Sequence, residues 1–250
     1  MNILAVIPAR YESTRFPGKP LIKIGDRPMI QCVYEAAIQC SAFSEVIVAT
    51  DSEAIAKCVH RFGGRVEMTR STHKTGTDRV AEVAQRYPEM QIVVNIQGDQ
   101  PFVTPTVLMQ LVQPYLDGES PTMTTLGCPL DLKEISAEAD RHHDYNNPNA
   151  VKVICDRHSN ALYFSRAPIP YFRNPGEAPV YHHLGLYAFD RAFLAQYAQL
   201  PPTPLEQCEG LEQLRVLEHG FSIRVCLTDQ PILEINTPED LTIATRSLES

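Results

Sequence analysis

Continuous apolar runs alternate with helix-period segments through the first half of the chain. The runs do not alternate between apolar and polar positions, and they fall at residues 3–7, 45–50, 65–69 and 92–97. Runs of this kind are typical of parallel strands that are covered by helices on both faces. We therefore expect four parallel strands in this part of the chain.

Between these runs, apolar residues recur at the spacing of an amphipathic helix. The three stripes are Ile30, Val33, Tyr34, Ala37 and Ile38; Ile55, Cys58, Val59 and Phe62; and Val80, Val83, Ala84 and Tyr87. Gly63 and Gly64 are placed to end the second helix, and Asp51 is placed to cap its start. The pattern predicts a βαβαβαβ core, that is, an α/β fold with a mainly parallel sheet and helices on both faces.

The alternation of strand-like and helix-like segments becomes less regular after a predicted helix at 106–117 and a predicted strand at 122–128. Residues 131–182 hold charged and proline-rich stretches around two strand-like segments, AVKVIC and ALYFS, and we interpret them as an inserted antiparallel sheet or arm. The core pattern resumes with the strand HLGLYAF, a helix that begins at TPLE, the strand FSIRVCL and a last helix that starts at Thr237. We expect a single domain over residues 1–250 with this insertion.

Charge is unevenly distributed along the chain. The 22 basic and 30 acidic residues give a net charge of −8, which argues against a general affinity for nucleic acid or for an anionic membrane. Residues 1–30 hold five basic and two acidic side chains, so this segment carries +3 and the remainder carries −11. Any recognition of phosphate must therefore come from a local cluster, and positive charge is concentrated where the chain begins.

The cysteines and the N-terminal segment favour a cytoplasmic protein without a membrane anchor. The seven cysteines form no C-x-x-C pair, which fits neither a disulfide framework nor a zinc site. The first apolar stretch, NILAVIP, is too short for a signal peptide or a membrane span.

Polar residues gather in three loops that leave predicted strands. The first strand runs into ARYESTRFPGKP, the third into RSTHKTGTDR and the fourth into QGDQP. Parallel sheets bind ligands beyond the carboxyl ends of their strands, so we expect these loops to meet at one edge. Arg10, Arg15 and Lys19 can neutralise phosphates, and Asp99 can hold Mg²⁺. The loops therefore predict a site for a metal-bound triphosphate.

Other nucleotide-binding signatures are absent from the sequence. Neither G-x-G-x-x-G nor G-x-x-x-x-G-K-[ST] occurs, which disfavours both an NAD-dependent oxidoreductase and a P-loop protein. A loop with Arg and Lys is also common as solvated surface charge. The position of this loop at the end of the first strand is what favours binding.

Nine blocks of sequence, spread from residue 7 to residue 241, share their order and spacing with one enzyme family. They are IPARYESTRFPGKPL, VATDSEAIA, GTDRVAEV, VNIQGDQP, NPNAVKV, ALYFSRAPIP, HLGLYAF, PLEQCEGLEQLRVL and NTPEDL. Together they resemble the 3-deoxy-manno-octulosonate (Kdo) cytidylyltransferases. The resemblance implies that the anomeric hydroxyl of a sugar acid attacks the α-phosphate of CTP and expels pyrophosphate, for the synthesis of cell-surface glycans such as lipopolysaccharide. It also implies the nucleotide-diphospho-sugar transferase fold, Mg²⁺ as cofactor, and a homodimer formed through residues 131–182.

The resemblance implies roles for five residues around the triphosphate. Ala9 and Arg10 would hold the nucleotide, while Arg15 and Lys19 would neutralise charge on the triphosphate and on the departing pyrophosphate. This agrees with the chemistry, because nucleotidyl transfer depends mainly on positioning and on stabilising negative charge. Asp99 would bind the metal, and its structural alternative is a turn-forming aspartate.

The resemblance also implies contacts to the rest of both substrates. Gly76, Thr77 and Arg79 would lie along the nucleotide, although Thr77 equally fits a helix N-cap. The residues implied for the sugar acid are Gln97, Arg166, His183, Tyr187, Glu212 and Gln213. Arg166 suits a carboxylate because a guanidinium donates to it bidentately, although packing or surface charge remains the alternative for each of the six. Glu206 is left out, because the segment TPLE fits a capping box.

Two positions depart from the metal site of the family. The family carries an aspartate before T-P-E-D-L and a glutamate after the metal aspartate, where this chain has Asn236 and Gln100. An amide oxygen can coordinate Mg²⁺ but brings no charge, so we expect weaker metal binding before substrate arrives. Side chains two apart on a strand face the same way, and we hypothesise that Glu234 supplies part of the missing charge, directly or through water.

Two other functions stay open from the sequence. The chain can be a cytidylyltransferase for another 2-keto acid sugar, such as 8-amino-Kdo or a sialic-acid relative. It can also be a non-catalytic nucleotide or sugar sensor, if Asn236 and Gln100 mark a loss of metal chemistry. Release of pyrophosphate from CTP with an acid sugar separates an enzyme from a sensor.

Overall fold

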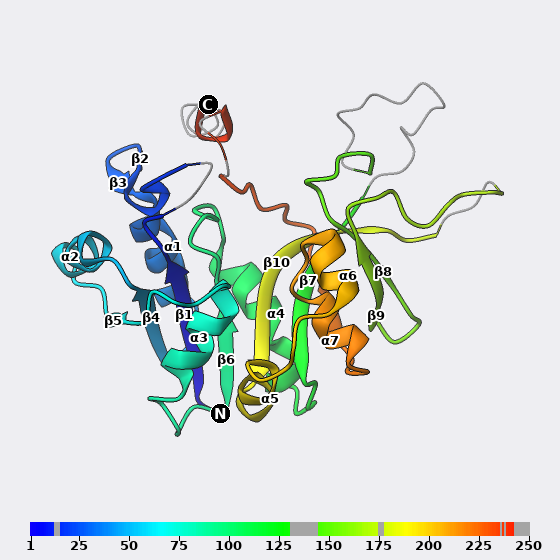
Figure 1. The fold of residues 1–250 in the computed structure, drawn as a ribbon, viewed down its shortest axis with the longest axis horizontal. Coiled ribbons are helices and arrows are strands. Elements are labelled where there is room, and N and C mark those ends of the chain that lie inside the picture. Colours follow the sequence, from blue (N-terminus) through cyan, green and yellow to red (C-terminus); the bar gives the residue numbers. More distant parts are fainter. Residues whose placement is uncertain (13–15, 131–144, 175–177, 236, 238, 243–250) are drawn as a thin grey trace.

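In a computed structural model of the chain, a central sheet is flanked by helices on both faces (Figure 1). The structure describes residues 1–12, 16–130, 145–174, 178–235, 237 and 239–242. The strands are β1 (Ile3–Ala9), β2 (Lys23–Ile24), β3 (Arg27–Pro28), β4 (Glu45–Thr50), β5 (Val66–Met68), β6 (Ile92–Asn95), β7 (Met123–Pro129), β8 (Lys152–Cys155), β9 (Ala161–Ser165), β10 (Tyr181–Asp190) and β11 (Arg224–Leu227). The helices are η1 (Lys19–Leu21), α1 (Met29–Ile38), α2 (Glu53–Arg61), α3 (Gly76–Ala84), α4 (Pro105–Leu116), α5 (Arg191–Tyr197), α6 (Pro204–Glu209) and α7 (Leu214–Glu218).

The main sheet has the strand order β11-β7-β10-β6-β1-β4-β5. Strand β1 pairs in parallel with β4 and β6, and β4 pairs in parallel with β5. Strand β10 is antiparallel to both of its neighbours, β6 and β7, while β11 is parallel to β7. The predicted α/β fold with a mainly parallel sheet is therefore confirmed. The antiparallel pair β8–β9 extends from β10 within the predicted insertion, although residues 131–144 and 175–177 of that insertion lie outside the described ranges.

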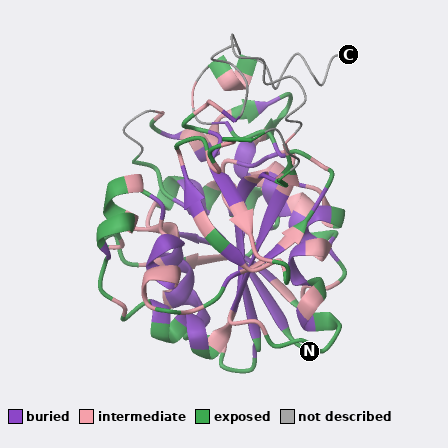
Figure 2. Cartoon of the chain, turned by 90° about the vertical axis from the view of Figure 1, so that its right-hand side faces the viewer, coloured by how far each residue is buried: buried purple, intermediate pink, exposed green. Residues whose placement is uncertain are grey.

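The first strand shows why helices cover both faces of this sheet. Ile3, Ala5 and Ile7 are fully buried in one cluster with the apolar sides of α1, α2 and α4. Leu4 and Val6 point the other way into a second cluster, with α3, α5 and α7. Burial of side chains of this size contributes about 1.5–3 kcal/mol each, so a strand that is apolar on both faces is stable only between two helical layers. Figure 2 shows the result, with buried strands inside and exposed helix surfaces outside.

The predicted helix ends are partly right. Gly63 follows α2 with a φ of 77°, a left-handed conformation that favours glycine, as predicted. The predicted cap at Asp51 is wrong, because Ser52 Oγ accepts the hydrogen bond from Ile55 N and Asp51 is used elsewhere. The helix expected from TPLE is interrupted at Gly210, which has a φ of 62°, and the chain resumes as α7.

The C-terminal segment crosses the carboxyl end of the sheet, from the side of β7 and β10 toward the β2–β3 hairpin (Figure 1). Its helix start is confirmed at Thr237, whose Oγ1 accepts from Asp240 N at 3.2 Å, while Asp240 Oδ2 accepts from Thr237 N at 2.8 Å. Asn236 and Pro238 lie outside the described residues. No helix in the described part of the chain is both long and apolar enough to cross a membrane.

Candidate active site

A cavity of about 260 Å³ opens at the carboxyl ends of β1 and β6 and at the start of α3. Seven of the residues predicted for the site line it: Ala9, Arg10, Lys19, Gly76, Arg79, Gln97 and Asp99. They come from the segments after β1, β5 and β6, which are far apart in sequence and meet at the same edge of the sheet because β6, β1, β4 and β5 run in parallel. The expectation that these three loops meet at one edge of the sheet is confirmed.

The arm after β1 folds back so that its lysine faces the loop after β6. Gly18 has a φ of 71° and its N–H donates to Tyr11 O at 2.9 Å, which closes a turn before η1. Lys19 Nζ then lies 2.7 Å from Asp99 Oδ2, and these side chains are 14% and 26% exposed. Arg15 lies outside the described residues, and its predicted role stays a prediction.

Two glycines let the loops approach the end of β1 closely. A Cβ atom at Gly98 would lie 3.0 Å from Pro8 O, and one at Gly76 would lie 3.3 Å from Pro8 Cγ. Larger residues would push the backbone of Asp99 and the start of α3 away from β1. These glycines are therefore part of how the fold brings the cavity walls together.

The C-terminal segment meets the loop that carries the predicted metal ligand. Ile235 N donates to Asp99 O at 3.0 Å, so the chain passes beside Asp99 just before Asn236. Gln100 is fully buried, and its Nε2 donates to Leu184 O at 2.6 Å and to Glu234 Oε1 at 2.9 Å. The amide at position 100 thus holds Glu234 next to the Asp99 loop, whereas the Glu234 side chain does not line the cavity.

The residues of this cavity fit a magnesium ion that is held mainly by its substrate. Asp99 is the acidic residue among those that line the cavity, and the described residues contain no group of three or more His, Cys, Asp or Glu side chains suited to a metal. Mg²⁺ commonly binds through one or two carboxylates together with water and substrate phosphates, and it does not need a complete protein cage. The donor set therefore matches Mg²⁺ better than it matches a structural metal.

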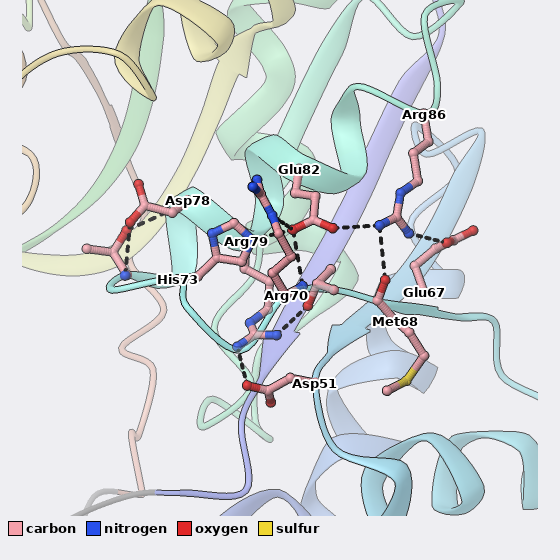
Figure 3. Close-up of polar contacts among 11 residues, drawn as sticks. Asp51, Glu67, Met68, Arg70, His73, Asp78, Arg79, Glu82 and Arg86 are labelled. Carbon is pink, nitrogen blue, oxygen red and sulfur yellow. Dashed lines mark hydrogen bonds and ion pairs between the residues drawn. The ribbon is translucent and has the colours of Figure 1, made fainter.

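Arg79 lines the cavity but is already held by protein groups (Figure 3). Its Nη2 donates to Asp51 Oδ2 at 3.0 Å and its Nη1 donates to Thr69 Oγ1. The side chain is only 5% exposed. Arg79 therefore ties the loops after β4 and β5 to α3, and it presents little free surface for a nucleotide.

Thr77 is buried beneath the cavity and joins two polar side chains from distant elements. Its hydroxyl accepts from Asn95 Nδ2 at 3.0 Å and donates to Glu212 Oε1 at 2.9 Å. Thr77 is not the helix N-cap, because Thr75 takes that position through a capping box with Asp78. Glu212 does not lie on an exposed helix face either, since its Oε2 is buried and makes no hydrogen bond to the described residues.

Burial controls the protonation of Glu212. Desolvation raises the pKa of this carboxyl to about 7, although the hydrogen bond from Thr77 opposes the shift. Asn95 Oδ1 is also buried without a partner in the described part of the chain. Two acceptors in one small network thus lack a donor, which a proton, a water molecule or a sugar hydroxyl can supply.

Three of the predicted sugar-binding residues form one chain of hydrogen bonds inside the protein. Thr125 Oγ1 donates its single proton to Leu186 O at 2.7 Å, so His183 Nε2, 2.9 Å away, must donate to Thr125. His183 Nδ1 then accepts from Gln213 Nε2 at 3.3 Å, and Gln213 Oε1 accepts from the Tyr187 hydroxyl at 3.1 Å. This network requires a neutral imidazole, in agreement with burial, which lowers the pKa of His183 to about 3.

Gln97 connects the cavity with this network. It lines the cavity, and its Nε2 donates to Gly185 O at 3.2 Å. Gly185 has a φ of 65° and lies in an irregular part of β10, between His183 and Tyr187. Gln97 thus links the cavity to β10, the strand that carries His183 and Tyr187.

Arg166 is firmly held without being neutralised. Its Nε donates to Glu209 O at 2.7 Å and its Nη1 donates to Pro148 O at 3.0 Å. The Glu209 carboxylate accepts from Arg166 N at 2.9 Å and not from the guanidinium. Within the described residues Arg166 forms no ion pair, which leaves its positive charge available to an anion.

Several residues that support the site were missed from the sequence. Asn95 ends the otherwise apolar strand β6, and that polar residue at the end of an apolar run is its only signal. Thr125 follows a second buried threonine, Thr124, in β7 and gives no such signal. The predicted capping box at Glu206 is confirmed, because its carboxylate accepts from Thr203 N at 3.1 Å, and it also accepts from Arg215 Nε at 2.8 Å.

Comparison with known proteins agrees with this geometry. A family model described as cytidylyltransferase matches residues 4–225. The chain is 66% identical over 241 residues to a 3-deoxy-manno-octulosonate cytidylyltransferase from Acaryochloris marina, covering 96% of this chain and 95% of that protein. It is 52% identical over 242 residues to a protein of the same name from Synechococcus elongatus, covering 96% of each.

Solved structures agree with these sequence comparisons. The structure of a CMP:2-keto-3-deoxy-manno-octonic acid synthetase complexed with CTP superposes with a TM-score of 0.90 at 40% identity, covering 100% of this chain and 99% of that one. A 4-diphosphocytidyl-2C-methyl-D-erythritol synthase from Anaerococcus prevotii shares the fold, with a TM-score of 0.63 at 14% identity, covering 100% of this chain and 99% of that one. The chain belongs to the cytidylyltransferase family and, within it, to the 3-deoxy-manno-octulosonate cytidylyltransferases.

Proposed function

We propose that this protein transfers the cytidylyl group of CTP to the anomeric hydroxyl of Kdo, giving CMP-Kdo and pyrophosphate. The observation that carries the proposal is the cavity at the end of β1, where Arg10, Lys19 and Asp99 meet in a chain that is 66% identical to a cytidylyltransferase named for this sugar acid. Three charged groups around an open cavity suit a triphosphate with its metal ion.

The cations of the cavity would bind and activate CTP by charge. Arg10 and Lys19 would contact the triphosphate, together with Arg15. When the triphosphate enters, Lys19 would exchange the Asp99 carboxylate for phosphate oxygens, which are stronger anionic partners. As the bond to the α-phosphorus breaks, negative charge moves onto the leaving pyrophosphate, and these cations stabilise it.

We further propose that the protein uses Mg²⁺. Asp99 would be its carboxylate ligand, and Asn236 would offer an amide oxygen next to it. When bound, the ion would neutralise phosphate charge and orient the triphosphate. Glu234, held by Gln100 at 2.9 Å, would act on the ion through water.

The sugar acid would bind on the β10 side of the cavity. Arg166 has an unneutralised guanidinium for the sugar carboxylate, and Gln97 lies between the two substrates. Glu212 and Gln213 would bond to sugar hydroxyls. His183 and Tyr187 would mainly orient Gln213, because their polar atoms already form a continuous chain.

A homodimer formed through residues 131–182 is also part of the proposal. Strand β9 has β8 as its strand partner among the described strands, Leu162 on it is 60% exposed, and Tyr171 is 89% exposed. Exposed apolar side chains on and near a strand that has one partner strand suit a second copy of the chain. Light scattering of wild type and Leu162→Lys tests it, and a monomeric wild type contradicts it. We also propose that the protein acts in the cytoplasm, where CTP is available.

Substrate competition tests the proposed specificity. Steady-state rates of pyrophosphate release from CTP should be measured with Kdo, 8-amino-Kdo and a sialic acid at matched concentrations. The proposal predicts the highest kcat/KM for Kdo. Faster turnover of another acid sugar would mean that this sugar is the substrate, while the proposed reaction would stand. No release of pyrophosphate with any of them would favour a nucleotide or sugar sensor.

A further inference from the structure

The loop between β5 and α3 forms one wall of the CTP cavity. His73, Lys74 and Thr75 of this loop line the cavity, next to Gly76 at the start of α3. None of these three residues was assigned a role from the sequence. The loop is therefore well placed to contact the nucleotide.

A single carboxylate anchors this loop to the helix that follows it. Glu82 Oε2 accepts from Arg70 N and from Arg70 Nε, both at 3.2 Å, and also from His73 Nε2 (Figure 3). Its other oxygen, Oε1, accepts from Arg86 Nη2 at 2.6 Å. Glu82 is 12% exposed and does not line the cavity. It thus fixes both ends of the segment that immediately precedes Lys74.

The protonation of Glu82 is consistent with a permanent anchor. Burial alone raises the pKa of this carboxyl, but the hydrogen bonds from His73 and Arg70 outweigh it and lower the pKa to about 2. The carboxylate therefore stays charged throughout the neutral range, and the loop stays attached.

The loop presents Lys74, a cation that the described residues do not neutralise. Arg79 is paired with Asp51 at 3.0 Å, and Arg70 is paired with Glu82 at 3.2 Å. Lys74 is exposed at the cavity wall and forms no hydrogen bond or ion pair with the described residues. A cation that is kept at a phosphate-binding cavity without a partner is suited to an anionic ligand.

We propose that Lys74 binds the phosphates of CTP, and that Glu82 is a positioning residue that holds the loop presenting it. This inference rests on the proposed function, because it takes CTP as the ligand. It adds a cation from the β5–α3 loop to Arg10 and Lys19 of the arm after β1, which line the same cavity. The triphosphate would thus be held from two sides.

Binding of CTP and of cytidine to the full-length protein tests the role of Lys74. Calorimetry should compare wild type, Lys74→Met and the control Lys57→Met, an exposed lysine on α2 outside the cavity. The proposal predicts that Lys74→Met weakens CTP binding by about tenfold, while cytidine binding stays unchanged. Lys74→Arg should restore most of the loss, and Lys57→Met should show none.

A double-mutant cycle tests the role of Glu82 against simple destabilisation. Glu82→Gln should weaken CTP binding in the wild-type background and have little further effect in the Lys74→Met background, because it acts through Lys74. Glu67→Gln is the control, since Glu67 also bonds to Arg86 without touching the loop. Additive losses in the cycle would overturn the positioning role.

The results of these experiments distinguish a failure of this inference from a failure of the proposed function. A wild-type protein that binds CTP with an affinity unchanged by Lys74→Met overturns the inference alone. A wild-type protein that binds no CTP overturns both.

Discussion

Lys19 Nζ lies 2.7 Å from Asp99 Oδ2, across the gap between the arm after β1 and the loop after β6. The pair joins the predicted phosphate-binding cation to the predicted metal ligand. Both groups are partly exposed, so the pair contributes little to stability and can exchange partners when a charged ligand enters. The proposed mechanism depends on this exchange.

Replacing Lys19 by Met should lower kcat/KM for CTP by about 10²-fold or more, because the developing charge on pyrophosphate loses a stabilising cation. Melting temperature should change little. Lys23→Met, which replaces an exposed lysine on strand β2, is the matched control. Equal losses in the two variants, measured by pyrophosphate release, would argue against a specific role for Lys19.

Asn236→Asp should lower the Mg²⁺ concentration needed for half-maximal activity, since it adds a carboxylate to a segment that reaches Asp99 through Ile235 N at 3.0 Å. Glu234→Gln should act in the opposite direction. Titration of pyrophosphate release against Mg²⁺ measures both effects. If the Mg²⁺ concentration at half-maximal activity is unchanged in both variants, this segment is not part of the metal site.

Arg166→Lys should raise KM for the sugar acid by about tenfold and leave CTP affinity unchanged, because a lysine cannot donate bidentately to a carboxylate. Arg224→Lys is a suitable control, since that arginine already pairs with Glu119 at 2.8 Å. A parallel rise in the dissociation constant for CTP would mean that Arg166 stabilises the fold of the site and does not bind the carboxylate of the sugar acid.

Glu212 should make stability depend on pH. Its pKa is about 7 in the folded protein and near 4.5 when exposed, so between these values the unfolded chain ionises first. Stability from this group is fully present below about pH 4.5 and is lost as pH rises through 7, by at most about 3 kcal/mol.

Denaturant unfolding of wild type and Glu212→Gln between pH 4.5 and 8 measures this contribution. As pH rises, the unfolding free energy of the wild type should fall relative to that of Glu212→Gln. Glu218→Gln serves as the control, because hydrogen bonds from the backbone of Leu205 and Glu206 lower the pKa of that carboxyl against a desolvation that raises it. A pH-independent difference for Glu212→Gln would contradict the buried, protonated state.

Residues at strand exits could be predicted from the sequence, and residues that support them could not. Arg10 and Asp99 follow apolar runs, and parallel pairing places such residues at one edge whatever their separation in sequence. Asn95 and Thr125 gave no comparable signal, because their partners come from α3 and β10 through tertiary packing. The same holds for Glu82, which looks like any surface charge of an amphipathic helix until Arg70 and His73 fold onto it.

The predicted elements were most accurate where apolar runs were long. The strand at 45–50 was predicted to the residue, whereas α5 and the β2–β3 hairpin were not predicted. Both are short, and both depend on neighbouring elements for their burial. The sugar-acid residues were assigned from the family resemblance and stay a prediction, since spacing alone does not relate Gln97 to Gln213.

The most direct measurement is the joint appearance of pyrophosphate and CMP-Kdo from CTP and Kdo with Mg²⁺, followed by a coupled assay and by mass spectrometry. We predict equimolar amounts of the two products, none without Kdo, and little with ATP or UTP in place of CTP. A wild-type protein that releases no pyrophosphate from CTP with Kdo or any related acid sugar would contradict the account.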